Sequence, residues 1–229
     1  MSGVKLTRQS LLDGSFAAAV RAHAPPGMRY MTDEERAADI DAILAAAPER
    51  RRIWVFGFGS LIWNPAFHFS ERRVARVIGY HRQFCLWARM GRGSPERPGL
   101  MLSLESRGSC TGVAYRIAHR DVRTELDVLW RREMASRAYR PVWAVARTPH
   151  GPEPAIAFAA NRSHERYARG LSMEETARYL AQGAGVMGRC CDYLFDTVTH
   201  LRDLGIRDHR LEELEARVRR LAGQEAAPR

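Results

Sequence analysis

Apolar and polar positions along the chain follow two spacings, one typical of helices and one typical of strands. Amphipathic spacing of three to four residues predicts helices over 32–47, 120–134, 172–182, 191–204 and 210–221. Thr32, with Glu35 three residues later, is typical of a capping box at a helix start. Runs rich in apolar, β-branched and aromatic residues predict strands over 52–58, 72–88, 100–105, 110–117, 138–148 and 153–160.

The order of these elements predicts the fold class. The strands gather in the middle of the chain and helices fill its last third, without a steady β-α-β alternation. This order favours an α+β fold, in which helices pack against a curled mixed sheet within a single domain. We predict that the domain spans residues 51–222, after an N-terminal helical extension over 1–50 and before a frayed tail over 223–229.

The predicted helix over 120–134 places one acid on its apolar face. At about 100° per residue, an apolar stripe covers about 100° of the helix surface and consists of Val122, Leu126, Leu129 and Trp130. Glu133 falls at about 20° from Val122, in the middle of this stripe. Such a position needs an explanation, because a carboxylate gains nothing from facing an apolar core without a partner.

Two interpretations of Glu133 are open. In the first, the helix ends nearby and the carboxylate pairs, at a wet margin, with Arg132, Arg137 or Arg140. In the second, Glu133 is a general base in a mostly apolar cleft, where the loss of water makes a carboxylate a better proton acceptor. A reaction that needs an amine deprotonated inside a pocket would call for the second arrangement.

Composition restricts the setting of the protein. Its 229 residues are 45% hydrophobic and 27% charged, as in an ordinary globular protein with a sizeable core. No run approaches the roughly 18 apolar residues of a membrane span, and the N-terminus lacks a signal-peptide pattern, so we expect no membrane partner. Four cysteines are too few for a disulfide framework, which favours a reducing, cytoplasmic location.

The net charge of +10 allows two interpretations. Cationic surfaces attract nucleic acid, but the arginines are spread along the whole chain and no nucleic-acid-binding motif accompanies them. A genome that favours arginine codons would give the same charge. We therefore expect a small-molecule partner and no nucleic acid, and keep a cationic nucleic-acid-binding protein as the alternative of a different class.

Two glycine-rich stretches were compared with known phosphate- and nucleotide-binding loops. "GFGSLIW" (57–63) follows a strand, but Ile62 takes the place of the third glycine of a dinucleotide fingerprint. It is either a tight turn or a loop that brings backbone N–H groups close to an anionic ligand. "GAGVMG" (183–188) follows a helix, which favours a helix connection or a cleft-lining loop over nucleotide binding. Cysteine and histidine spacing predicts no metal site.

Three segments together resemble the ChaC-like family of glutathione-specific γ-glutamylcyclotransferases. They are "WVFGFGSLIWNPAF" (54–67), "GRGSPERPG…TGVAYRI" (91–117) and "LWRREMASRAYRPVW" (129–143), and the likeness extends over about 54–204. The resemblance implies a γ-glutamylcyclotransferase-like catalytic domain over 51–222, with a small mixed, barrel-like sheet and no cofactor or metal. It also implies a lyase reaction in which the α-amine of glutathione attacks the γ-carbonyl, giving 5-oxoproline and Cys-Gly.

The resemblance also assigns site residues. The family's catalytic acid matches Glu133, which would act as general acid and base. The substrate-binding positions match Gly57, Phe58, Gly59, Ser60, Leu61, Ile62, Tyr139 and Tyr193. The Tyr139 hydroxyl either orients Glu133 or its ring only fills the core. The alternative within this family is a cyclotransferase acting on another γ-glutamyl amine or dipeptide.

Three positions depart from the family pattern. Phe58 replaces a usual tyrosine, Leu100 a usual arginine and Cys190 a typical asparagine. Because Leu100 removes one partner for a substrate carboxylate, we expect these changes to loosen or shift recognition of the Cys-Gly half. The sequence predicts no oligomeric state.

Overall fold

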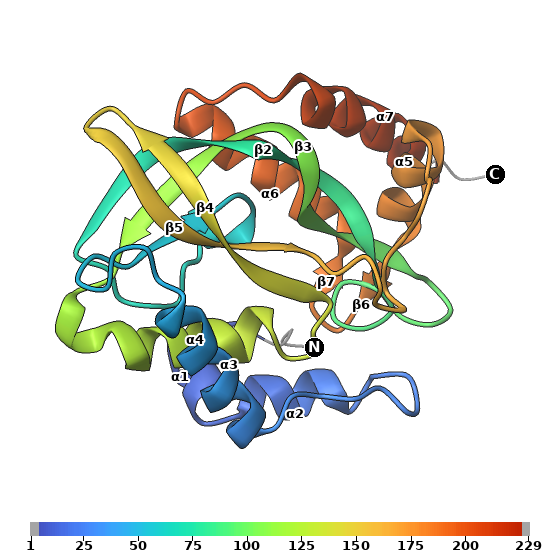
Figure 1. The fold of residues 1–229 in the computed structure, drawn as a ribbon. Helices are drawn as coiled ribbons and strands as arrows, with labels where there is room; N and C mark the ends of the chain where they lie inside the picture. Colours follow the sequence, from blue (N-terminus) through green and yellow to red (C-terminus); the bar gives the residue numbers. More distant parts are fainter. Residues whose placement is uncertain (1–4, 226–229) are drawn as a thin grey trace.

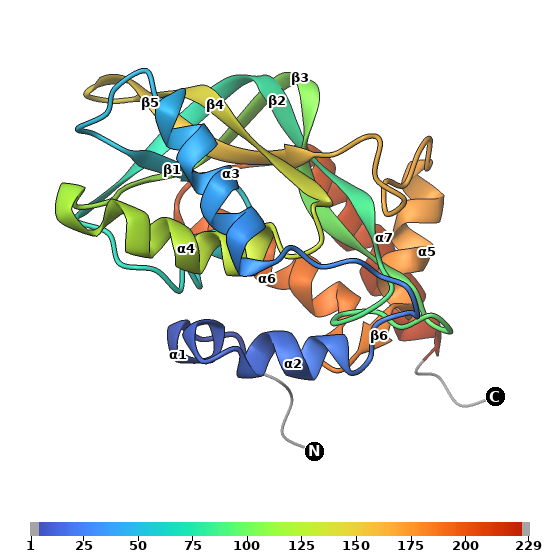
Figure 2. The same ribbon diagram turned by 60° about the horizontal axis from the view of Figure 1, so that its bottom comes forward.

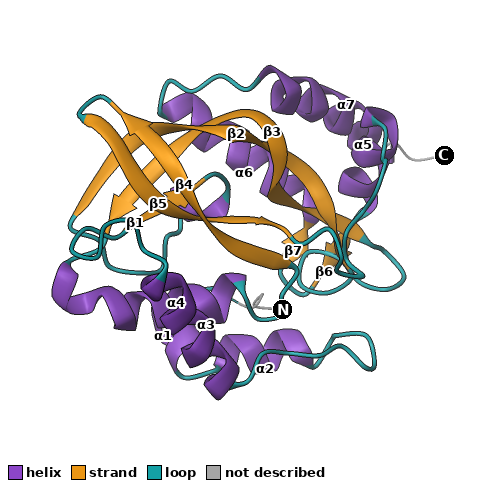
Figure 3. Ribbon diagram, in the orientation of Figure 1, coloured by secondary structure: helices purple, strands orange, loops and turns teal. Residues whose placement is uncertain are grey.

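The structure, a computed structural model that describes residues 5–225, is built around a closed five-stranded barrel (Figures 1 and 3). The strands are β1 (Trp54–Gly57), β2 (Glu71–Ala88), β3 (Gly99–Arg116), β4 (Tyr139–Thr148) and β5 (Gly151–Ala160). Their order around the barrel is β1-β3-β2-β4-β5, with antiparallel neighbours. A parallel pairing of β1 with β5 closes the barrel, so the predicted α+β fold with a mixed, barrel-like sheet is confirmed.

The long β2–β3 hairpin corrects one strand prediction. The predicted strands over 100–105 and 110–117 are one continuous strand, β3. Between them, Arg107 and Gly108 have φ angles of 83° and 73°, and the register with β2 shifts between Ile78 and Tyr80. The residues that look like a strand end therefore form a β-bulge, after which pairing resumes.

Helices lie on two sides of the barrel. They are α1 (Arg8–Leu12), α2 (Ser15–Arg21), α3 (Asp33–Ala45), α4 (Val122–Glu133), α5 (Met173–Gln182), α6 (Cys190–Asp203) and α7 (His209–Glu225). The short elements are the 3₁₀ turns η1 (Ser60–Ile62) and η2 (His119–Asp121) and the strand pair β6 (Ala184–Gly185) and β7 (Gly188–Arg189). In Figures 1 and 2, α1 to α4 gather on one side and α5 and α7 lie away from them. All five predicted helices are present with slightly shifted ends.

Helix starts follow their predicted caps. The Thr32 hydroxyl accepts the Glu35 N–H (3.2 Å), and the Glu35 carboxylate accepts the Thr32 N–H (3.0 Å), which starts α3. Ser172 and Glu175 form the same arrangement before α5. Each box satisfies backbone donors that the helix itself leaves free.

The larger of two hydrophobic clusters fills the barrel and continues under the N-terminal segment. Trp130 of α4 meets Phe158 of β5 edge to face, with ring centroids 5.5 Å apart. The indole N–H of Trp130 donates to Asp39 of α3 (2.6 Å). The N-terminal residues Leu11 and Ile40 belong to the same cluster. Helices α1 and α3 are therefore packed onto α4 and, through it, onto the barrel. No helix within residues 5–225 is long and apolar enough to cross a bilayer.

Candidate active site

A pocket of about 300 Å³ opens where α4 ends. Its wall combines Glu133 at the end of α4, Ser60 in η1, Tyr139 at the start of β4 and Tyr193 in α6. The volume is in the range of small-molecule sites. Helix α4 ends at Glu133 and β4 starts at Tyr139, and two residues of the connecting turn, Ala135 and Ser136, also line the pocket.

Glu133 is held in this pocket by its neighbour in sequence. Its side chain is 15% exposed, and its Oε1 accepts the Nε–H of Arg132 (2.7 Å), whose side chain is 4% exposed. Glu133 therefore has one of the partners expected for a helix end, but it lines a pocket and does not lie at a wet margin. The second oxygen, Oε2, has no hydrogen-bond partner among residues 5–225.

Arg132 fixes the distance between the acid and the glycine turn. One Nη donates to the Ser60 hydroxyl (2.8 Å), and the other donates to the carbonyls of Asn64 and Pro65 (3.3 Å for Pro65). A buried arginine with acceptors on every side has little rotational freedom, because its planar donors all require fixed geometry. The ends of α4 and β1 are thus linked through one guanidinium.

Gly59 allows the close approach of Tyr193 to the turn. A Cβ atom on Gly59 would lie 2.6 Å from the Tyr193 hydroxyl oxygen, closer than any real contact of this kind. Burial raises the pKa of Tyr193 to about 12 and the charge of Glu133 acts in the same direction, while the Ser60 N–H opposes them. The Tyr193 hydroxyl therefore stays protonated beside Ser60 and Glu133.

Tyr139 also lies in the pocket wall, but not in the orienting role considered from the sequence. Its hydroxyl donates to the Leu102 carbonyl (2.9 Å), so its one proton is not available to Glu133. Burial raises the pKa of Tyr139 well above its usual value; the nearby charge of Glu133 adds to this and Arg166 opposes it. The Tyr139 hydroxyl therefore stays protonated and neutral, and the charged side chains of Glu133 and Arg166 both lie near it.

The glycine turn meets the pocket through fewer side chains than predicted. Of the six predicted turn residues, only Ser60 lines the pocket. Phe58, Leu61 and Ile62 are buried in the hydrophobic cluster, and Gly57 is pressed between Leu61 and Tyr115. The side chains of Phe58, Leu61 and Ile62 therefore support the turn from the core. A direct substrate-binding role is left to the backbone of the turn and to the Ser60 side chain.

Two of the departures from the family pattern are buried against each other. Leu100 and Cys190 are both 0% exposed, and neither lines the pocket. The Cys190 thiol donates to the Leu100 carbonyl (3.0 Å) and accepts the Leu100 N–H (3.3 Å). Both residues therefore belong to the packing between β3 and α6, and the expected change in recognition of the Cys-Gly half stays a prediction.

The pocket wall carries an excess of positive charge. Five arginines line it with a single carboxylate, Glu133; they are Arg21, Arg92, Arg131, Arg132 and Arg166. Arg131 pairs with Asp127 outside the pocket and Arg132 pairs with Glu133. The other three have no ion pair among the described residues. Such a wall favours an anionic ligand.

The four cysteines do not add a reactive centre. All of them are free and buried, and burial raises the pKa values of Cys85 and Cys190 to about 12 and of Cys110 to about 11. No three histidine, cysteine or acidic side chains within the described part of the chain come together as a metal site.

A family model described as ChaC-like protein matches residues 53–221 of the sequence. The chain belongs to the ChaC-like family. This ChaC-like protein is 38% identical over 192 residues to the glutathione-specific γ-glutamylcyclotransferase of Escherichia coli (strain K12), covering 83% of each chain. It is 30% identical over 183 residues to γ-glutamylcyclotransferase 2-3 of Arabidopsis thaliana, covering 75% of this chain and 91% of the relative. Its fold matches the crystal structure of a yeast γ-glutamyl cyclotransferase specific to glutathione, with a TM-score of 0.69 and 21% identity over 77% of this chain and all of the yeast chain.

The ChaC-like protein also has pocket residues that sequence reasoning missed. Phe16 and Val20 of α2 and Tyr30 before α3 line the pocket from the N-terminal segment. Met187, in the glycine-rich segment 183–188, lines it too, and its N–H donates to Gly91 (2.8 Å). The interpretation of that segment as a cleft-lining loop is therefore confirmed, whereas nothing in the spacing of the N-terminal residues pointed to a pocket.

Proposed function

We propose that this ChaC-like protein is a γ-glutamylcyclotransferase that cleaves glutathione into 5-oxoproline and Cys-Gly. The observation that carries the proposal is the fixed position of Glu133, a mostly buried carboxylate that Arg132 ties to the Ser60 turn. The names of the E. coli and yeast relatives support glutathione as the substrate. The excess of arginine in the pocket supports it as well, because glutathione carries two carboxylates.

The first task of the site is to hold the γ-glutamyl chain in a folded conformation. The nucleophile of this reaction is the substrate's own α-amine, so no second reactant has to be bound. Fixing the rotamers that bring the amine next to the γ-carbonyl can supply up to about 7–11 kcal/mol of the barrier reduction. A rigid pocket wall, with Glu133 and Ser60 joined through Arg132, suits this task.

Glu133 then moves the protons. Its Oε2, which has no hydrogen-bond partner among residues 5–225, accepts a proton from the α-ammonium, and the free amine attacks the γ-carbonyl carbon. A C–N bond forms to close the five-membered ring, and the bond from that carbon to the cysteine nitrogen breaks. Glu133 returns this proton to the departing nitrogen. The carboxylate then takes the second proton from the ring nitrogen and passes it to the Cys-Gly amine, so Cys-Gly leaves as an ammonium, 5-oxoproline keeps one ring N–H and no water is consumed. General acid–base catalysis of this kind contributes about 10²–10⁴-fold in rate.

The glycine turn is the proposed site for developing negative charge. The N–H groups at the start of a helical turn have no acceptor within it, so those of Gly59, Ser60 and Leu61 are candidate donors to the substrate. Tyr193, protonated at all ordinary pH values, is a further neutral donor beside Ser60. Removal of one such donor typically costs about 10²–10³-fold in rate.

The substrate is tested by incubating the protein with glutathione, γ-Glu-Cys and γ-Glu-Ala and measuring 5-oxoproline. We expect product from glutathione. Product from the dipeptides alone would favour the alternative of another γ-glutamyl substrate. No product from any of them, together with steeply salt-dependent retention on nucleic acid, would favour a nucleic-acid-binding protein.

The role of Glu133 is tested with Glu133→Gln, which keeps the shape of the side chain but cannot take a proton. We expect the free energy of unfolding to change little and kcat with glutathione to fall by about 100-fold or more. The matched control is Glu174→Gln on α5, where the glutamate is 55% exposed and far from the pocket wall. Turnover by a folded Glu133→Gln variant equal to that of the control would exclude Glu133 from the mechanism.

We also propose that the protein works in the cytoplasm. The four free cysteines support a reducing compartment, because oxidising compartments favour disulfides.

A further inference from the structure

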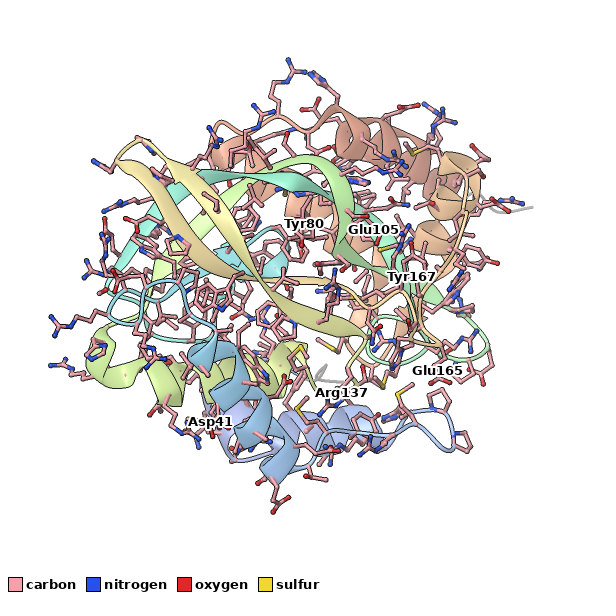
Figure 4. The ribbon with its side chains drawn as sticks, viewed as in Figure 1. Asp41, Tyr80, Glu105, Arg137, Glu165 and Tyr167 are labelled. Carbon is pink, nitrogen blue, oxygen red and sulfur yellow. The ribbon has the colours of Figure 1, made fainter. Side chains whose placement is uncertain are left out.

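Arg166 is a pocket arginine that has no ion pair among residues 5–225. It follows β5, in the segment between Glu165 and Tyr167, both labelled in Figure 4. Its Nε donates to the Trp87 carbonyl (2.8 Å) and one Nη donates to the Ser136 hydroxyl (3.0 Å). Both acceptors are neutral. No carboxylate within residues 5–225 lies within 4 Å of this guanidinium, and the adjacent Glu165 is solvent-exposed.

The pKa of Arg166 shifts in the opposite direction from that of an ion-paired arginine of this chain, Arg36. Burial lowers the pKa of Arg166; Tyr139, Tyr30 and the more distant charge of the exposed Glu165 only partly offset this, and Arg89 adds to it. For Arg36, burial acts in the same direction, but Asp127 and Asp33 outweigh it and raise the pKa. A partly buried cation without a counterion is costly, and an anion that binds beside it recovers part of that cost.

Arg166 is also fixed before any ligand arrives. Its backbone carbonyl accepts the Trp87 N–H (2.7 Å), so backbone and side chain of Arg166 are both tied to the same residue at the end of β2. Two donors are used on neutral acceptors, and the second Nη has no partner among the described residues. Five N–H groups in a rigid fork suit a planar carboxylate, and fixing the fork in advance reduces the entropy lost on binding.

The position of Arg166 relative to Glu133 indicates which carboxylate it meets. Tyr139 lies near the charges of both Glu133 and Arg166. Ser136, which accepts a hydrogen bond from Arg166, lies three residues after Glu133 in the turn between α4 and β4. All four residues line the same pocket. A substrate with its γ-carbonyl at Glu133 therefore extends past the Tyr139 ring toward Arg166.

We propose that Arg166, supported by Ser136, binds the C-terminal carboxylate of the substrate's Cys-Gly half and so selects a γ-glutamyl tripeptide over a dipeptide. This inference rests on the proposed cyclotransferase function. The cysteine carboxylate of γ-Glu-Cys is one residue, or roughly 3.5 Å of chain, closer to the bond that breaks and does not reach Arg166. Leu100, which stands where the family usually has an arginine, is buried and carries no charge, and Arg166 supplies a cation for the carboxylate instead.

The test combines a changed substrate with a changed residue. The substrates are glutathione, its glycine amide and γ-Glu-Cys. The proteins are wild type, Arg166→Met, Arg166→Lys and, as control, Arg169→Met, at an exposed arginine of the same segment. For wild type and control we expect kcat/KM to be about 10- to 100-fold lower for the amide than for glutathione. Arg166→Met should lower kcat/KM for glutathione by the same factor, mainly through KM, and leave the amide and γ-Glu-Cys unchanged. Arg166→Lys should recover part of the loss.

Two results would overturn the proposal. One is equal kcat/KM of the wild type for glutathione and its amide, which needs no variant and holds even where Arg166→Met does not fold. The other is an equal loss for all three substrates in Arg166→Met, which would mean a merely structural role. Failure of the cyclotransferase function itself is distinct, since then wild type and control release no 5-oxoproline from any of the three.

Discussion

At the scale of single residues, Arg132 is the link between the acid and the turn. Its guanidinium reaches Glu133, Ser60 and two backbone carbonyls, although its side chain is only 4% exposed. Loss of this residue would free the carboxylate to rotate without removing it. Mutation of Arg132 therefore changes the position of the Glu133 carboxylate, whereas mutation of Glu133 removes the carboxylate.

Arg132→Met should lower kcat with glutathione by about 10- to 100-fold with a smaller change in KM, because it removes the positioning of Glu133, the proposed base, and leaves its carboxylate in place. The control is Arg123→Met on the exposed face of the same helix, where the arginine pairs with Asp41. Steady-state kinetics on both variants provide the measurement. A proportional rise in KM with unchanged kcat would contradict the positioning role.

The close contact between Gly59 and Tyr193 leads to a second prediction for single residues. Gly59→Ala places a methyl group where the Tyr193 hydroxyl now lies, so we expect a loss of about 1–3 kcal/mol in the free energy of unfolding. Adding Tyr193→Phe removes the oxygen that is hit and should restore most of that stability, measured by urea unfolding. If the double variant is no more stable than Gly59→Ala, the Tyr193 oxygen is not the atom in conflict.

At the scale of elements, the short helix α1 is attached to α4 by a buried ion pair. Arg8 donates to both oxygens of Glu125 (2.8 Å for Nη2 to Oε1), and Glu125 also accepts the His68 N–H (2.9 Å). The Glu125 side chain is 3% exposed. Through this pair, the N-terminal segment is held beside the pocket that its residues Phe16 and Val20 help to line.

Arg8→Met should leave the Glu125 carboxylate buried without its cation and cost about 2 kcal/mol or more in stability. Because α1 and α2 then loosen from the pocket, KM for glutathione should rise more than kcat changes. Arg120→Met, at an arginine that is 89% exposed, serves as control. Urea unfolding and steady-state kinetics are measured together, and unchanged stability would show that the pair does not anchor α1.

The same elements show how far the sequence alone predicts the molecule. Helix α3 was predictable because its capping box is local, and the apolar stripe of α4 correctly placed Glu133 toward a pocket. The burial of Glu125 was not predictable, because α1 covers that flank of α4 and α1 is too short for a periodic pattern. The proposed role of Arg166 depends on the lack of a carboxylate beside its guanidinium in the fold, and residue spacing along the chain does not reveal which groups come close in space.

At the scale of the whole molecule, the buried thiols make stability depend on alkaline pH. The pKa values of Cys85 and Cys190 are raised to about 12 and that of Cys110 to about 11 in the fold, whereas an exposed thiol has a pKa of about 8.5. These groups contribute stability that is fully present below about pH 8.5, where the unfolded chain keeps its protons, and that is lost as pH rises toward their folded values. Each thiol contributes a slope of about 1.4 kcal/mol per pH unit.

We therefore expect a lower free energy of unfolding at pH 10 than at pH 8, measured with urea. Titration of basic side chains contributes little to the difference in stability between pH 8 and pH 10, because Lys5 is the one lysine of the chain and arginines stay charged. Cys110→Ala should reduce the difference between the two pH values by about 2 kcal/mol. Equal stability at pH 8 and pH 10 in the wild type would contradict the buried, protonated state of these thiols.

Complete burial of the cysteines has a chemical consequence for an enzyme that handles a thiol peptide. Exchange between a protein cysteine and glutathione disulfide requires a thiolate that an incoming sulfur can reach. Cys190 and Cys191 begin the helix that carries Tyr193 into the pocket, yet both are 0% exposed. The folded protein can thus meet the oxidised form of its proposed substrate without forming a mixed disulfide at its own cysteines.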